Sequence, residues 1–184
     1  MIAEAGSIGY TFNGIQREEW PKIKGSCRYG QVPSLKISDS ITIFQTTCIA
    51  RYLAQEGNLY PSDHIQATLS EEYVATLDEL LTKFFKATFY APEETKEAEL
   101  KTFIEGPLNC VMTAFDAVIS QNGGLMCGSL SWADLYCYDF TRFIVAKQID
   151  LSTYPNVLSL ISNVETNEKV KAFVASNRNL RNRK

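Results

Sequence analysis

The sequence predicts an α+β fold in two parts, a small part that contains strands followed by a larger part built of helices. Short β-branched and apolar runs bounded by turn residues precede residue 45. From residue 64 onward apolar residues recur at three- and four-residue steps, the period of an amphipathic helix. Between them, residues 58–63 form the one clear linker signal. We therefore expect one domain over residues 1–57 and a second over residues 62–184.

The first elements are short. Residues 1–5 resemble the last turn of a helix, and Gly6 follows where a C-terminal cap favours glycine. Ile8, Tyr10 and Phe12 alternate with small or polar residues, which predicts a half-buried strand.

Two further strands are predicted over residues 34–37 and 41–44, joined by a small polar turn. Pro33 cannot donate to a sheet ladder, so it should lie at the start of the first strand or in a bend before it. If the Val32–Pro33 peptide bond is cis, the backbone of Val32 turns outward and can pair with a ligand.

The second strand passes directly into a helix whose first residues are Gln45, Thr46 and Thr47. A helix N-terminus has free N–H groups and a dipole that favour an anion. Together with Val32, this helix start predicts a binding site for a peptide-like carboxylate ligand.

The second part begins with one long helix that the segment 91–93 breaks. A second long helix runs from about residue 100 to 119, with Pro107 expected to kink it, and residues 122–124 stop it.

A third helix should begin at Ser131, because serine is a good N-cap and Asp134, three residues on, can bond back to it. We treat Asp134 as structural for this reason. Two more helices are expected after Pro155 and after Asn167.

The bulk composition excludes several classes of protein. A net charge of −3 argues against nucleic-acid binding, and we expect the basic tail from Arg178 onward to be a frayed, solvated end. No apolar run reaches the roughly 18 residues of a membrane span, and no signal-peptide pattern is present. The lone His64 has no partner at metal-ligand spacing, so no metal is expected.

The 5 cysteines are odd in number and form no C-x-x-C pair, which favours reduced thiols in a cytoplasmic protein. Cys48 falls inside the helix that follows the binding turn, and we expect it to be packed rather than reactive.

Three sequence blocks carry a family resemblance. Residues 30–33 (GQVP), followed at this spacing by Gln45 and Thr46, resemble the glutathione-binding half of a cytosolic glutathione S-transferase. Residues 20–24 (WPKIK) are similar to the sigma-type branch, and residues 128–135 (GSLSWADL) resemble the second domain of that family. The resemblance implies a thioredoxin-like N-terminal domain, here truncated, and an all-α helical bundle as the C-terminal domain.

The resemblance also implies glutathione as co-substrate, bound along the seam between the domains. The residues that match the family's ligand positions are Trp20, Lys24, Gln31, Val32, Pro33, Gln45, Thr46 and Asp78. Val32 would pair its backbone with the cysteinyl backbone of glutathione, and Gln45 and Thr46 would hold the γ-glutamyl end. Taken singly, Gln45 and Thr46 could also be ordinary helix-start residues.

The remaining positions concern the two ends of the ligand. Trp20, Lys24 and Gln31 would hold the glycine end, and Asp78 would reach the amine of glutathione bound in the neighbouring subunit of a homodimer. The alternative for Asp78 is a solvated acidic helix face. Arg28 and Tyr29 depart from the family pattern without touching the ligand chemistry directly.

Catalysis in this family needs the thiolate of glutathione, which a tyrosine hydroxyl at the end of the first strand stabilises in sigma-type relatives. Residues 1–6 align with the end of the helix after that strand, so we assign no catalytic residue and expect an incomplete version of a longer transferase. Transfer of the glutathione thiolate to small apolar electrophiles is the implied reaction. A non-catalytic glutathione-binding or structural protein and a glutathione-dependent prostaglandin-type isomerase are the alternatives.

Overall fold

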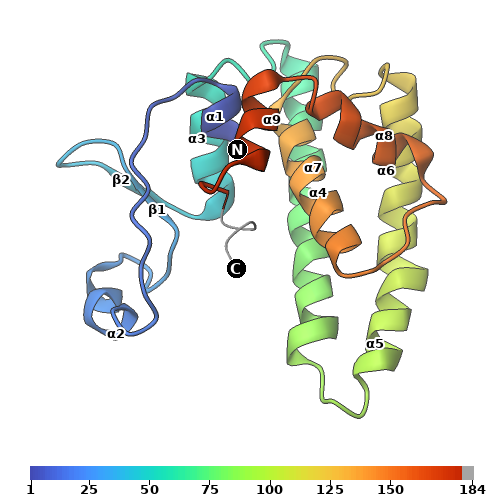
Figure 1. Ribbon diagram of the computed structural model, residues 1–184, viewed down its shortest axis with the longest axis horizontal. Helices are drawn as coiled ribbons and strands as arrows, with labels where there is room; N and C mark the ends of the chain where they lie inside the picture. Colours follow the sequence, from blue (N-terminus) through green and yellow to red (C-terminus); the bar gives the residue numbers. More distant parts are fainter. Residues whose placement is uncertain (180–184) are drawn as a thin grey trace.

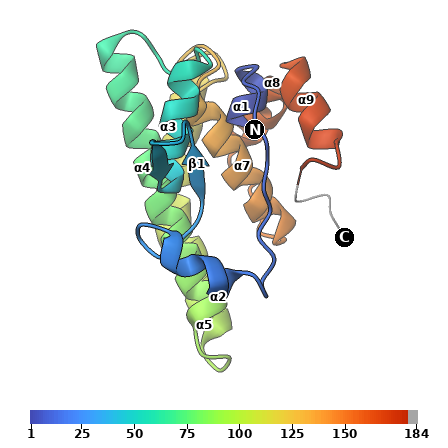
Figure 2. The ribbon, with the colours of Figure 1, turned by 90° about the vertical axis from the view of Figure 1, so that its left-hand side faces the viewer.

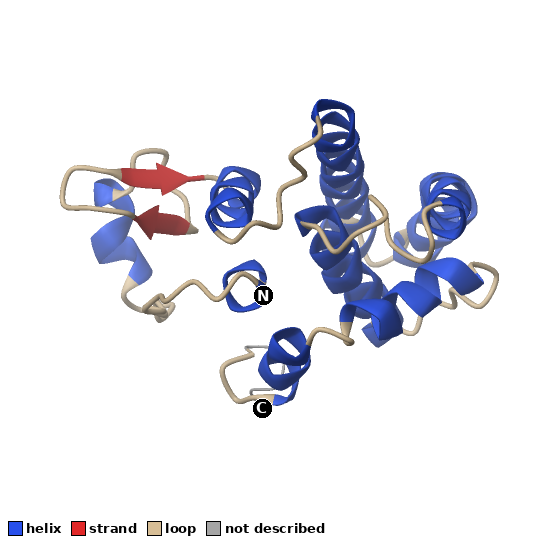
Figure 3. Cartoon of the chain, turned by 90° about the horizontal axis from the view of Figure 1, so that it is seen from above, coloured by secondary structure: helices blue, strands red, loops and turns tan. Residues whose placement is uncertain are grey.

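The computed structural model describes residues 1–179 and shows a small strand-containing part beside a larger helical part (Figure 1). The first part contains α1 (Ile2–Ala5), α2 (Trp20–Ile23), the 3-10 turn η1 (Lys24–Ser26), β1 (Ser34–Lys36), β2 (Thr42–Phe44) and α3 (Thr46–Glu56). The second contains α4 (His64–Phe85), α5 (Lys96–Phe103), α6 (Asn109–Gln121), α7 (Trp132–Ala146), α8 (Pro155–Val164) and α9 (Glu168–Ala175), with π-helical turns η2 (Lys86–Tyr90) and η3 (Ile104–Leu108). Seen from above, α1 and α3 lie between the hairpin and the helices of the second part (Figure 3).

The hairpin of β1 and β2 confirms the two strands predicted around the polar turn. The strands pair antiparallel, with Ser34 opposite Phe44 and Leu35 opposite Ile43. This register brings the residue before β1 next to the residue after β2, and so places the two predicted binding segments side by side.

The strand predicted over residues 8–12 is wrong. Within the described residues the sheet consists of β1 and β2 alone, and residues 8–16 are irregular. Tyr10 and Phe12 are 43% and 56% exposed. Alternation predicts a strand only where a neighbouring strand supplies ladder hydrogen bonds and a covered face, and this segment has neither.

Helix α1 is present as predicted, but the glycine after it has a different role. Gly6 has a φ of −81°, which is not the left-handed conformation of a glycine cap. A Cβ atom on Gly6 would lie 2.7 Å from the Cα of Gly57, so the glycine is required by the close approach of α1 to the end of α3.

Helix α4 agrees with the first predicted long helix, and it forms the centre of the core with α7 (Figure 1). The second long helix is divided into α5, η3 and α6, with Pro107 inside η3. Proline lacks the N–H for an α-helical hydrogen bond, and the π-helical turn is the local form that the kink takes. The core contains fully buried Phe84, Met112, Ile119, Trp132 and Ile144.

Several contacts join the two parts. The backbone N–H of Trp132 on α7 donates to the carbonyl of Leu59, just after α3, at 2.9 Å. Arg51 on α3 forms an ion pair with Glu71 on α4 at 2.8 Å. These contacts fasten α3 to the helical part, and the domain boundary over residues 58–62 stays a prediction.

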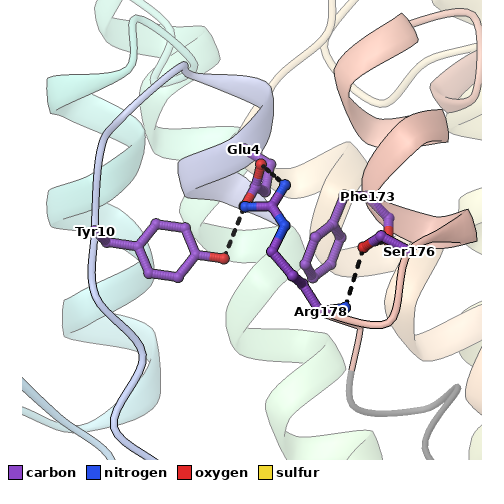
Figure 4. Close-up of polar contacts among 5 residues, drawn as sticks. All are labelled: Glu4, Tyr10, Phe173, Ser176 and Arg178. Atoms are coloured by element: carbon purple, nitrogen blue, oxygen red, sulfur yellow. Dashed lines mark hydrogen bonds and ion pairs between the residues drawn. The ribbon is translucent and has the colours of Figure 1, made fainter.

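The N-terminal helix lies beside the C-terminal one (Figure 2). Arg178 donates from two guanidinium nitrogens to Glu4, at 2.7 and 2.9 Å, and the Tyr10 hydroxyl donates to the same carboxylate at 2.8 Å (Figure 4). Arg178 is therefore held by α1 and is not the start of a frayed end, as the sequence had suggested. The rest of that prediction, over residues 180–184, lies outside the described residues.

No helix in the part of the chain that the structure describes is both long enough and apolar enough to cross a bilayer.

Candidate functional site

A small pocket lies where the loop before β1 meets the start of α3. Its volume is about 40 Å³, whereas a cavity needs roughly 10–15 Å³ on the same measure to hold one water molecule. The pocket is lined by Tyr29, Gln31, Val32, Pro33, Phe44, Gln45 and Thr46. Such a volume accepts a carboxylate or amide group, so any larger ligand would lie across the surface with one group inserted.

The backbone at the pocket is unusual on both sides. The Val32–Pro33 peptide bond is cis, and Val32 is 47% exposed. Gln45, the N-cap of α3, has a φ of 74°, in a region that residues other than glycine rarely adopt. Residues other than glycine with a positive φ, such as Gln45, gather at binding sites, where the surrounding structure holds them.

Thr46 is the first residue of α3, so the pocket lies at a helix N-terminus. The backbone N–H groups of a first helical turn have no partner within the helix, and the helix dipole adds a partial positive charge there. The pocket is therefore suited to a negatively charged group.

Two predicted residues lie outside the pocket lining. Trp20 is half-buried at the start of α2, and Lys24 is exposed in η1. The Lys24 side chain runs beside Gly30. A Cβ atom added to Gly30 would lie only 3.6 Å from Lys24 Cε. Lys24 thus borders the segment that lines the pocket, whereas Trp20 is not among the lining residues.

Two aromatic residues of the lining were absent from the predicted set. The rings of Tyr29 and Phe44 pack edge to face, with centroids 5.8 Å apart. The Arg28 guanidinium carbon lies 5.3 Å from the Phe44 centroid and 6.0 Å from that of Tyr29. Their positions directly before Gly30 and Gln45 are the one sequence signal that could have indicated them. The Arg28 guanidinium thus places a positive charge against the aromatic wall of the pocket.

Asp78 lies on α4 and contacts α3 and α7 of its own chain. Its carboxylate accepts hydrogen bonds from the hydroxyls of Thr47 and Tyr136. Burial, and then the neighbouring Asp78 carboxylate, raise the pKa of the Tyr136 hydroxyl. Asp78 does not line the pocket, and its reach to a ligand in a neighbouring subunit stays a prediction.

Comparison with known proteins assigns the chain to a family. The family model described as the C-terminal domain of glutathione S-transferase matches residues 78–177. The chain belongs to the glutathione S-transferase family. This confirms the resemblance and the α+β fold class with a helical second part.

Relatives extend the family match over nearly the whole chain. A glutathione S-transferase from Anopheles gambiae is 26% identical over 179 residues, covering 95% of this chain and 87% of the relative. Hematopoietic prostaglandin D synthase from Gallus gallus is 27% identical over 175 residues, covering 95% and 86%. The solved structure of prostaglandin synthase D from Nilaparvata lugens has a TM-score of 0.86 at 27% identity, over 96% of this chain and 89% of that chain.

Metal-binding clusters and cysteine thiols are the other groups in the described residues that could take part in chemistry. Among residues 1–179 no group of three or more His, Cys, Asp or Glu side chains is placed to hold a metal ion. Cys137 is buried, whereas Cys110 is exposed. Cys48 is exposed as well, so the prediction that it is packed is wrong; the first turn of α3 leaves this side chain uncovered.

Proposed function

We propose that the chain binds glutathione at the pocket of residues 29–46 and transfers its thiolate to small apolar electrophiles. The observation that supports this most is the convergence of Val32 with Gln45 and Thr46 on one pocket at a helix N-terminus. The family assignment supplies the glutathione chemistry. The same assignment supports a sigma-like, cytoplasmic homodimer as the working form.

The ligand would lie extended across the pocket. The γ-glutamyl carboxylate would enter at Gln45 and the N–H and hydroxyl of Thr46, where the helix start favours an anion. The exposed Val32 backbone would pair with the cysteinyl unit. Lys24, Gln31 and Trp20 would take the glycine end, which is consistent with the Lys24 side chain running beside Gly30.

Two further parts of the proposal concern the partner subunit and the second substrate. Asp78 would approach the amine of glutathione bound in the other subunit. Exposed aromatic side chains at the end of α4 and in η2, among them Phe85 and Phe89, offer an apolar surface for an electrophile. The hydroxyl that stabilises the thiolate is not assigned to any residue described here.

Calorimetric titration with glutathione tests the binding step. We expect Thr46→Val to raise the Kd about 10-fold or more, because a hydrogen bond to a charged group is lost while the backbone N–H stays. Thr68→Val is the matched control, since its hydroxyl bonds the His64 carbonyl near the start of α4, and it should leave the Kd unchanged. No binding to the unsubstituted protein, or equal Kd values for both variants, would contradict the proposal.

Turnover separates the alternatives. Conjugation of a chlorinated aromatic substrate supports transferase activity. Isomerisation of a prostaglandin endoperoxide without conjugation supports the second candidate, which the similarity to two prostaglandin D synthases favours. Binding of glutathione without either reaction supports a non-catalytic glutathione-binding protein.

A further inference from the structure

Three side chains from three helices meet beside the pocket. Thr47 comes from α3, Asp78 from α4 and Tyr136 from α7. One carboxylate oxygen of Asp78 accepts the Thr47 hydroxyl and the other accepts the Tyr136 hydroxyl. We call these residues the Asp78 cluster. Both hydrogen bonds end on a carboxylate, which makes them stronger than bonds between neutral groups.

The cluster acts on the part of α3 that carries the binding residues. Thr47 directly follows Thr46, which lines the pocket. The backbone of Gln45, just before it, has the strained φ of 74°. A strained turn persists only where neighbouring contacts hold it. The Thr47 hydroxyl anchors α3 two residues after this turn, and the Arg51–Glu71 ion pair holds α3 one helical turn later.

Tyr136 in turn orients the Asp78 carboxylate, which is the acceptor of the Thr47 hydroxyl. The ring lies on α7, half-buried against the helical core, and its hydroxyl donates to one oxygen of the Asp78 carboxylate, which fixes the orientation of that group. Without that hydroxyl, one oxygen of Asp78 loses its partner and the carboxylate is free to rotate away from Thr47. The link from the core to the start of α3 would then weaken.

We propose that Tyr136 is a positioning residue for the glutathione pocket, acting through Asp78 and Thr47 on the first turn of α3. The inference rests on the proposed function, because it names a residue that shapes the same site. Tyr136 itself does not line the pocket.

The chain offers a matched control on the same helix. Tyr138 also donates its hydroxyl to a carboxylate, that of Glu165, at 2.6 Å. The changes Tyr136→Phe and Tyr138→Phe each remove one phenol hydroxyl and leave the ring in place. A general loss of stability would therefore affect both variants, whereas a loss of pocket geometry would affect Tyr136→Phe alone.

Calorimetry with glutathione on the full chain is the first measurement. We expect Tyr136→Phe to raise the Kd about threefold to tenfold, which corresponds to the net contribution of one hydrogen bond. Tyr138→Phe should leave the Kd unchanged. Thr47→Val should weaken binding to a similar degree. The two changes together should cost little more than either alone, because both break the same link.

Amide hydrogen exchange without ligand is the second measurement. The amides of residues 49–52 report on the start of α3, since the Ile49 N–H donates to the carbonyl of Gln45 at 3.0 Å. Tyr136→Phe should speed their exchange and Tyr138→Phe should not.

The two measurements separate the inference from the function on which it rests. If the unsubstituted protein binds no glutathione while Tyr136→Phe alone speeds exchange, the proposed function fails and the positioning role is supported. If Tyr136→Phe matches Tyr138→Phe in both Kd and exchange, the positioning role is overturned.

Discussion

At the scale of single residues, the cysteines differ sharply in environment. Cys137 has 0% exposure on α7, and burial raises the pKa of its thiol to about 12, because the thiolate would lose its hydration. The hydroxyl of Thr141, 3.9 Å away, opposes the shift only in part. Cys48 and Cys110 are exposed. Only a thiolate reacts with alkylating agents, so these environments predict reactivity directly.

We expect iodoacetamide at pH 8 to label Cys48 and Cys110 in the folded protein and to leave Cys137 unlabelled. With a pKa of about 12, only about one Cys137 in ten thousand is thiolate at that pH, and the side chain is covered as well. Mass spectrometry of digested protein measures the labelling at each site. Labelling of Cys137 in denaturant is the control, and labelling of native Cys137 at the rate of Cys48 would contradict the prediction.

The same shift has a defined effect on stability. The folded-state pKa of Cys137 is raised above the ordinary value of 9.0, so the thiol binds its proton more tightly in the folded state. Its contribution to stability is complete below pH 9 and is lost as the pH rises through about 12.

Some residues of the candidate site could be predicted from the sequence and others could not. Val32, Gln45 and Thr46 line one pocket, and their meeting could be predicted from local signals, namely a proline before a strand and a helix start. Tyr136 could not, because its partner Asp78 is 58 positions away and only the packing of α7 on α4 joins them. For Phe44 the one signal was its position directly before Gln45, because the residue type alone does not distinguish an aromatic side chain in a pocket wall from one in a core.

At the scale of elements, Asp134 connects the start of α7 to the loop before it. Its carboxylate accepts from the N–H of Ser131 at 2.8 Å, which is the bond of a capping box that the N3 side chain makes. The same carboxylate accepts from the Ser131 hydroxyl at 2.6 Å. It also accepts from the N–H of Met126 at 2.6 Å, a bond that sequence spacing did not indicate. Burial raises the pKa of Asp134, and these fixed donors offset part of that shift.

We expect Asp134→Ala to lower the free energy of unfolding by about 2–4 kcal/mol, because a cap is lost and the buried Met126 N–H loses its acceptor. Asp63→Ala is the matched control. Asp63 caps α4 at the surface, where its side chain accepts from the Gln66 N–H at 2.9 Å, and its loss should cost about 1 kcal/mol. Urea unfolding measures both. A cost for Asp63→Ala equal to that for Asp134→Ala would show that the Met126 bond contributes nothing.

Helices were more predictable than strands for a physical reason. The period of α4 is a local property, and its hydrogen bonds close within the segment. The segment of Tyr10 and Phe12 has the alternation of a strand, but a strand forms only against a partner, which alternation does not reveal. The division of the second long helix at η3 follows from Pro107, although the proline predicts a kink and not its π-helical form.

At the scale of the whole molecule, Glu4 and Arg178 join segments that are 174 positions apart. The pair is bidentate, and its side chains are 14% and 63% exposed, for Glu4 and Arg178 respectively. Water therefore screens the guanidinium side. Helix α1, which carries Glu4, packs through Gly6 against Gly57 at the end of α3, so the pair also secures one side of the element that begins at the pocket.

A double-mutant cycle with Glu4→Gln and Arg178→Met should give a coupling of about 0.3–1 kcal/mol in dilute buffer, discounted for the exposure of Arg178. In 0.5 M salt the coupling should fall, because the Debye length drops well below 10 Å. The exposed pair Lys36–Asp39, 2.7 Å apart, is the control and should give no measurable coupling. Tyr10→Phe should lower the coupling slightly, since the Tyr10 hydroxyl holds the Glu4 carboxylate in place. Equal coupling for the two pairs would mean that two-point contact with a largely covered carboxylate adds nothing to the joining of α1 and the segment after α9.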